Sequence, residues 1–198
     1  MALAWHIIFG AYGFWLPNDP RGSWSDFVGR WELVRFGKAT KVNVPWSLAA
    51  VEHDERLRLE AKRALKFPAV QFTGRQALAV AHGFKRACEE GGYAACACSI
   101  MPEHVHLVIA RHERDIGRII GHLKTRATQR LAAEGLWPAD SRPVWAHGGW
   151  KVFLDEPKDV ARAVAYVEAN PEKEGKPRQR WSFVGLPAPS RAADTRAH

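Results

Sequence analysis

The chain has 198 residues and a formal net charge of +8, with 46% hydrophobic and 25% charged residues. This balance is that of a globular protein with one domain, and it excludes a disordered or collagen-like chain. No apolar run reaches the ~18 residues of a membrane-spanning helix, and we expect no secretory signal. A basic protein of this size commonly binds a polyanion, nucleic acid before membrane, although an arginine-rich genome gives the same charge.

The three cysteines, Cys88, Cys96 and Cys98, form no Cys-x-x-Cys pair. This pattern argues against a zinc knuckle or a disulfide framework and fits a reducing cytoplasm. We expect small core residues, with Cys96 and Cys98 on the same side of a strand.

The N-terminal third predicts one strand followed by a long excursion. The segment from Leu3 to Tyr12 is rich in strand-forming residues. Residues 17–72 then mix turn-forming, aromatic and charged residues, and we interpret them as an insertion or surface excursion. Within it, residues 51–67 carry apolar side chains at helical spacing.

The next helix is marked at both ends. Thr73 followed by Gln76 matches a capping box, and the pair Gly91-Gly92 is typical of a helix end. Apolar residues recur on one face between these signals, which supports an amphipathic helix.

The second half of the chain predicts the remaining elements. We expect strands over residues 93–100 and 104–110, a helix over residues 115–134, a hairpin or strand over residues 142–155, and a helix over residues 157–170. Without the insertion, the order is βαββαβ. This order predicts an α+β ferredoxin-like sandwich, an antiparallel sheet with helices on one face. We expect a single domain over residues 1–184 and a flexible tail over residues 185–198.

The segment MPEHVHLVIA places two histidines inside an apolar run. On a strand, side chains alternate between faces, so His104 and His106 lie about 6.6 Å apart on one face and Val105 points to the core. Two neutral imidazoles are the beginning of a divalent metal site. Two histidines on a half-exposed sheet face without a ligand give the same pattern.

The last helix supplies candidates for a third ligand and a reacting group. Tyr166 and Asn170 are four residues apart and therefore share one helix face. Asn170 would add an oxygen ligand, and Tyr166 would attack a phosphorus bound at this site. A phenol reacts poorly at neutral pH, so this attack requires a metal ion that polarises the phosphate. The alternative is a tyrosine that covers the core and an asparagine that caps a helix stopped by Pro171.

These segments resemble a known family. MPEHVHLV resembles the His-hydrophobic-His motif of the single-tyrosine HUH transposases, which include the insertion-sequence type and the REP-associated tyrosine transposases. YVEANPEKEG resembles the catalytic-tyrosine helix of that family, and FGAYGFWLPNDPRGSW resembles the first-strand segment of its longer members. The matches follow the family's order and span most of residues 3–184.

The resemblance implies a transposase-type endonuclease that cuts and rejoins single-stranded DNA near hairpins. Tyr166 would form a 5′-phosphotyrosine intermediate, and His104, His106 and Asn170 would bind Mg²⁺ or Mn²⁺. The implied partner is single-stranded DNA with a hairpin or inverted repeat, and a homodimer that exchanges the tyrosine helix is one arrangement open to it. The implied location is cytoplasmic and nucleoid-associated.

Several basic residues are candidate contacts to DNA phosphates, which would make affinity depend on salt. They are Lys124, Arg126, Arg130, Arg21, Lys173 and Arg178. A solvated helix face is an equally good explanation for those on the helix over residues 115–134. The tryptophans of the insertion would stack on unpaired bases or anchor loops.

Other functions fit less well. A histidine-triad hydrolase needs a third histidine where Val108 stands, and Glu103, the acidic neighbour that a zinc hydrolase would use, faces the opposite way on a strand. A domesticated, non-catalytic protein that binds single-stranded DNA hairpins remains the alternative.

Overall fold

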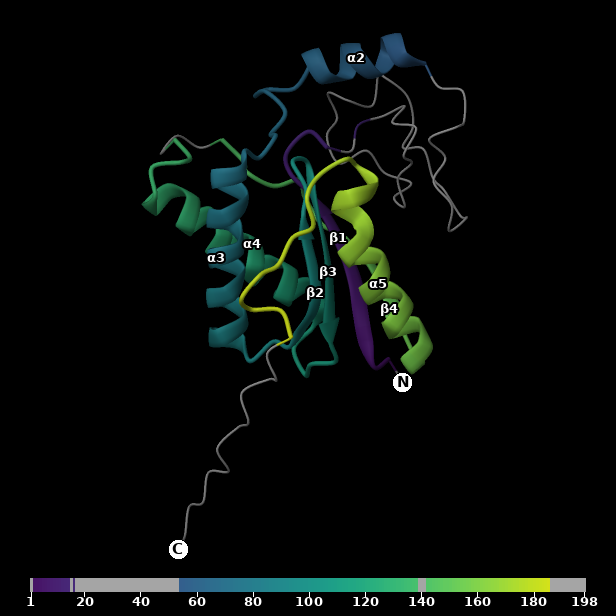
Figure 1. Cartoon of the computed structure of the whole chain (residues 1–198). Helices are drawn as coiled ribbons and strands as arrows, with labels where there is room; N and C mark the ends of the chain where they lie inside the picture. The colour runs from purple at the N-terminus through teal and green to yellow at the C-terminus, as the bar shows by residue number, and fades with distance from the viewer. Residues whose placement is uncertain (1, 15, 17–53, 139–141, 186–198) are drawn as a thin grey trace, which may run out of the picture.

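The computed structural model describes residues 2–14, 16, 54–138 and 142–185. Most of the predicted insertion and the predicted tail beyond residue 185 lie outside these residues. None of the described helices is long and apolar enough to cross a membrane. The elements, in chain order, are β1 (Ala4–Gly10), α2 (Glu55–Arg63), α3 (Gly74–Gly91), β2 (Ala95–Ile100), β3 (His104–Ala110), α4 (Ile116–Ala133), β4 (Trp150–Leu154) and α5 (Pro157–Lys173) (Figure 1).

The strands form one antiparallel sheet in the order β2-β3-β1-β4. β1 and β3 are therefore central, and β2 and β4 are edges. α3 connects β1 to β2 and α4 connects β3 to β4, and both helices lie on one face, which confirms the predicted α+β sandwich. α5 follows this βαββαβ unit and covers the other face of the sheet (Figure 1).

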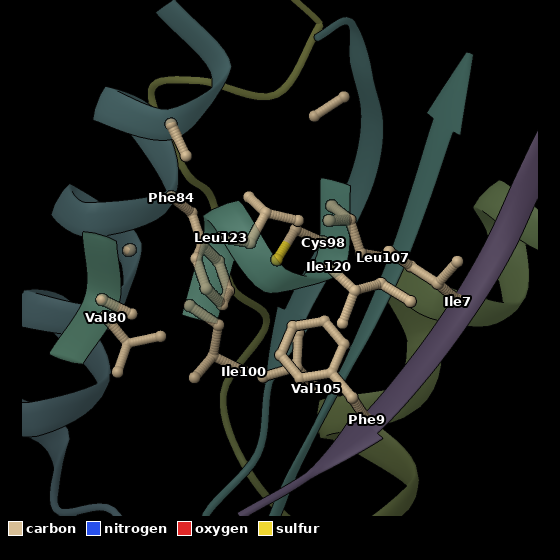
Figure 2. Packing of buried hydrophobic residues seen from close by; sticks show 14 of the residues in the cluster. Ile7, Phe9, Val80, Phe84, Cys98, Ile100, Val105, Leu107, Ile120 and Leu123 are labelled. Atoms are coloured by element: carbon tan, nitrogen blue, oxygen red, sulfur yellow. The ribbon is translucent and has the colours of Figure 1, made fainter. Parts of the chain in front are cut away.

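The main core lies between the sheet and the helix pair α3–α4. Alternation along the strands directs Ile7, Phe9, Val105 and Leu107 to this face, where all four are fully buried. They meet apolar residues of both helices, including Phe84 (Figure 2). Burial of each such side chain contributes about 1.5–3 kcal/mol, so this face supplies most of the stability.

The ends of α3 follow the predicted signals. Thr73 accepts a hydrogen bond from the Gln76 backbone and the Gln76 side chain accepts one from the Thr73 backbone, which completes the capping box. Gly92 ends the helix with φ of 69°, in the left-handed region that favours glycine.

The cysteines are core residues, but they do not share a side. Cys98 belongs to the main core, whereas Cys96 packs with the cluster under α5. The reason is a register shift between Ala95 and Ala97 in β2, where a bulge turns the strand over by one residue. The prediction of a common face for Cys96 and Cys98 is therefore wrong.

The chain after α5 returns along the edge strand β2 as a strap, residues 174–185 (Figure 1). The Gln179 side chain donates to the Ile100 carbonyl and accepts from the Ile100 N–H, both at 2.8 Å. Further on, the Gly185 N–H donates to the Ala95 carbonyl, and Phe183 is buried in the main core. The strap thus attaches the C-terminal end of α5 to the sheet.

Gly83 marks a close approach of α3 to α4 and gives a test of the packing. A Cβ there would lie 2.5 Å from Ala127 Cα and 2.7 Å from the Arg126 carbonyl oxygen. We expect Gly83→Ala to lower the free energy of unfolding by about 1–3 kcal/mol, because backbone must move to admit the methyl group. Urea unfolding followed by circular dichroism measures the change.

Gly121→Ala is the matched control on α4, where an added Cβ meets nothing within 4 Å. Alanine has the higher helix propensity, so this change should raise the free energy of unfolding by up to about 1 kcal/mol. A Gly83→Ala protein as stable as Gly121→Ala would contradict the close approach of the two helices.

Candidate functional site

β3 carries His104 and His106 on the face that α5 covers. Their ring centroids lie 4.9 Å apart, with the planes at 74°. The His104 ring stacks on Phe14 at a centroid distance of 4.7 Å. His106 is buried under α5 with 5% of its surface exposed. The two imidazoles therefore point the same way, and His104 is the more accessible one.

A third imidazole, which the sequence pattern does not single out, completes the row. His6 of β1 is buried on the same face, and its Nε2 lies 3.2 Å from Nδ1 of His106, within hydrogen-bond distance. The ring centroids are 5.4 Å apart and the rings are stacked. The signal that points to His6 in the sequence is a polar side chain inside the apolar strand AWHIIFG.

Burial keeps these two imidazoles uncharged. It lowers the pKa of His6 to about 4. Burial, followed by the nearby His104, His6 and Lys173, holds the pKa of His106 well below its usual range. At neutral pH both rings are therefore neutral, the form in which an imidazole nitrogen keeps a lone pair for a metal ion.

α5 places Tyr166 against the two buried histidines. The Tyr166 ring centroid lies 5.6 Å from that of His106 and 5.9 Å from that of His6, both in edge-on geometry. Tyr166 is 44% exposed, so part of the residue is accessible from outside. Burial, with a smaller effect of Glu174, raises the pKa of Tyr166, and the phenol is therefore protonated at neutral pH.

Asn170 lies inside α5 rather than at its end. The prediction that the helix ends at Pro171 is wrong, because α5 continues through Pro171 to Lys173. A proline near the C-terminal end removes one backbone donor from the helix, and the burial of Pro171 against the protein offsets this loss. Asn170 is 6% exposed, and its Nδ2 has no hydrogen-bond partner among the described residues.

The donor set fits a divalent ion that binds both imidazole and oxygen ligands. Across the part of the chain that the structure describes, no three histidine, cysteine or carboxylate side chains gather to hold a metal ion. His106 offers a neutral nitrogen, His104 supplies a second imidazole, and Asn170 is a buried amide with a carbonyl oxygen. A metal at this position would thus need oxygen ligands beyond the histidines, as hard cations prefer.

Of the predicted DNA-contacting residues, Lys173 lies beside Tyr166 and Arg178 binds another part of α5. The Lys173 ammonium is 4.4 Å from the centroid of the Tyr166 ring. Arg178, in the strap, forms an ion pair with Glu168 of α5. Arg21 lies outside the described residues.

The other three belong to α4, on the far side of the sheet. Arg126 pairs with Glu90 at 2.6 Å, and Arg130 pairs with Glu134. Lys124 is directed inward. A DNA strand at Tyr166 and one at α4 would therefore contact different faces of the protein, and the role of these residues in DNA binding stays a prediction.

Lys124 holds the segment that leads into β4. Its ammonium donates to the carbonyls of Ala146, at 2.8 Å, and Gly148, and it lies 5.2 Å from the centroid of the Phe9 ring. Burial lowers the pKa of Lys124 to about 8. These contacts are with the protein's own backbone, so the structure gives Lys124 a structural role.

Comparison with known proteins places these residues in context. A family model described as transposase, IS200-like, matches residues 67–170. A protein of Haemophilus influenzae described as a REP-associated tyrosine transposase is 29% identical over 100 residues, which are 46% of this chain and 57% of that protein. The match thus spans little more than half of the relative's length.

Two solved structures align with most of the chain. The first is a REP-associated tyrosine transposase bound to a REP hairpin, with a TM-score of 0.50, 15% identity, and coverage of 92% of this chain and 76% of that one. The second is a transposase from Deinococcus radiodurans, with a TM-score of 0.39, 13% identity, and coverage of 85% and 90%. At this level of identity, the first likeness supports the fold alone.

Lys124→Met tests the structural role of the buried ammonium. A depressed pKa means that folding favours the neutral amine of Lys124, so the contribution of this group to stability is full above pH 10.5 and is lost as the pH falls toward about 8. The stability of the wild type relative to Lys124→Met should rise by about 2–3 kcal/mol between pH 7 and pH 10. Denaturant unfolding at several pH values measures it.

Lys151→Met removes an exposed lysine of β4 and controls for the loss of one charge. Between pH 7 and pH 10, the difference in free energy of unfolding from the wild type should change more for Lys124→Met than for Lys151→Met. An equal change for the two variants would show that the Lys124 ammonium is not buried.

Proposed function

Because this chain belongs to the IS200-like transposases, whose family model matches residues 67–170, we propose that it cuts and rejoins single-stranded DNA near hairpins. The observation that carries the proposal is the contact between the Tyr166 and His106 rings, whose centroids are 5.6 Å apart. A single chain thus brings a half-exposed phenol next to the neutral imidazole of His106, which is one of the proposed metal ligands. This is a candidate nucleophile beside a candidate metal ligand.

Tyr166 is the nucleophile in this proposal. Its phenol oxygen attacks the phosphorus of a DNA phosphodiester, the phenol proton passes to water, and the bond from phosphorus to the 3′ oxygen breaks. The 3′ oxygen takes up a proton from water and becomes a free hydroxyl, and the 5′ phosphate stays linked to Tyr166. Rejoining reverses the step with a new 3′ hydroxyl, so no external energy source is required.

His104, His106 and Asn170 would hold Mg²⁺ or Mn²⁺. The ion would supply Lewis-acid polarisation of the phosphate, which a phenol with a raised pKa requires. Because His106 is neutral at neutral pH, no added proton occupies the nitrogen lone pair that the metal ion would bind. The Lys173 ammonium, next to the Tyr166 ring, adds positive charge where the phosphate would lie.

The proposed substrate is single-stranded DNA that carries a hairpin. A structure with the same fold is that of a REP-associated tyrosine transposase bound to a REP hairpin. The net charge of +8 supports a polyanionic partner. On the face of Tyr166, the half-exposed side chains of Ile8 and Trp150 lie in register with His106 across the sheet, and they offer apolar surface for an unpaired base.

A second candidate is a protein that binds the hairpin without cutting it. The raised pKa of Tyr166 favours this candidate, because nothing among the described side chains activates the phenol by itself. Strand cleavage and hairpin binding use the same DNA ligand, but only cleavage forms a covalent bond between Tyr166 and the DNA. One experiment that detects this bond therefore separates the two functions.

The decisive experiment incubates the protein with Mg²⁺ and single-stranded oligonucleotides that carry the inverted repeats flanking its gene. We expect a covalent protein–DNA adduct on denaturing gels, absent in Tyr166→Phe. Tyr93→Phe removes another phenol hydroxyl, one bonded to His122 on the side of the sheet opposite Tyr166, and should retain the adduct. Hairpin binding without an adduct by the wild type would support the non-catalytic candidate instead.

Metal removal gives an independent prediction. EDTA, His104→Ala and His106→Ala should each reduce adduct formation by about a hundred-fold or more, since a Lewis acid contributes several kcal/mol to such a step. Hairpin affinity, measured by gel shift, should change little. His82→Ala on α3, which removes an imidazole far from the α5 face, is the control. Adduct formation that persists in EDTA would contradict a role for the metal.

A further inference from the structure

His6 is placed to control the chemistry of His106. The two rings belong to adjacent central strands, and their only possible hydrogen bond joins Nε2 of His6 to Nδ1 of His106 at 3.2 Å. Both rings are buried, with 8% and 5% of their surfaces exposed, so water does not compete readily for this bond. The edge of Trp150 packs against His6 at a centroid distance of 6.3 Å and helps to fix its ring.

The direction of this bond decides which atom of His106 can bind a metal. A neutral imidazole carries one N–H, on either Nδ1 or Nε2. If His106 accepts through Nδ1, its proton sits on Nε2 and no lone pair remains free. If His106 donates from Nδ1, Nε2 keeps its lone pair and is available as a ligand.

We propose that His6 is a positioning residue whose Nε2 accepts the Nδ1–H of His106, which holds His106 in the tautomer with a free Nε2. This inference deepens the proposed function and rests on its assignment of His106 as a metal ligand. Histidine ligands commonly donate their second N–H to a neighbouring acceptor, which fixes the ring orientation and makes the ligand nitrogen more basic. Here the acceptor is itself an imidazole, supplied by the strand next to the ligand.

The same geometry argues against His6 as a third metal ligand. Its Nε2 is already engaged with His106, and in this arrangement the proton of His6 sits on Nδ1. Neither nitrogen then keeps a free lone pair.

The first test reads the tautomer directly in the metal-free protein. Long-range ¹⁵N–¹H correlation spectra distinguish Nδ1–H from Nε2–H imidazoles, and the His106 signals are assigned by their loss in His106→Ala. We expect His106 as the Nδ1–H tautomer in the wild type, with loss of this preference in His6→Phe. The Nε2–H tautomer in the wild type would overturn the proposal.

The second test measures affinity for Mn²⁺ by calorimetry, without DNA. His6→Phe should weaken binding by about 10–100-fold, the usual effect of removing such an acceptor. His6→Gln keeps an acceptor oxygen and should recover most of the affinity. His112→Phe, a histidine next to Tyr93 and away from the site, controls for the substitution itself.

An unchanged affinity for Mn²⁺ in a folded His6→Phe protein would overturn the proposal. Electron spin-echo spectroscopy that detects three imidazole nitrogens bound to Mn²⁺ would also overturn it. If His6→Phe does not fold, His6→Gln and the wild-type tautomer still decide the question. Neither readout depends on DNA cleavage. Wild-type Mn²⁺ binding and the expected tautomer together with no DNA adduct would therefore refute strand cleavage and leave the role of His6 intact.

Discussion

The arrangement of the site depends on the alternation of side chains along the two central strands. In β1 and β3, the residues Ile7 and Leu107 enter the main core, and their neighbours His6 and His106 face α5. A slip of one residue in this pairing would move the histidines into the main core and expose the large apolar side chains. The hydrophobic effect therefore holds the register, and the register aligns the imidazoles to within hydrogen-bond distance.

Burial then determines the charge of the groups on the α5 face. It removes the positive charge from His6 and His106 and keeps the proton on Tyr166, so these three rings are neutral at neutral pH. Lys173 provides a cation beside them. A buried site of neutral rings imposes a small electrostatic penalty on its own fold, and under the proposed function the charges needed for strand cleavage would be brought by the metal ion and the DNA.

Much of this structure follows from local sequence patterns. Strand alternation and helical periodicity predicted the central strands, α3 and α4, and therefore the sandwich. Strand alternation predicted a common face for His104 and His106, and the position of Tyr166 on the last helix predicted that it could overhang that face. His6 could not be identified in this way, because its contact with His106 arises from the pairing of strands 100 residues apart. The inward direction of Lys124 was equally hidden, since its partners are backbone carbonyls of a distant loop.

The strap has a consequence for how two copies of this protein could share a site. Exchange of α5 between chains would have to release Gln179 from the backbone of β2 and withdraw Phe183 from the main core. Until the strap finds a new partner, an exposed Phe183 costs about 3–5 kcal/mol, and the edge of β2 is open to pairing with other strands. The strap thus couples α5 to the edge strand: α5 could pass to a second copy only together with the strap, which would have to find the same partners there.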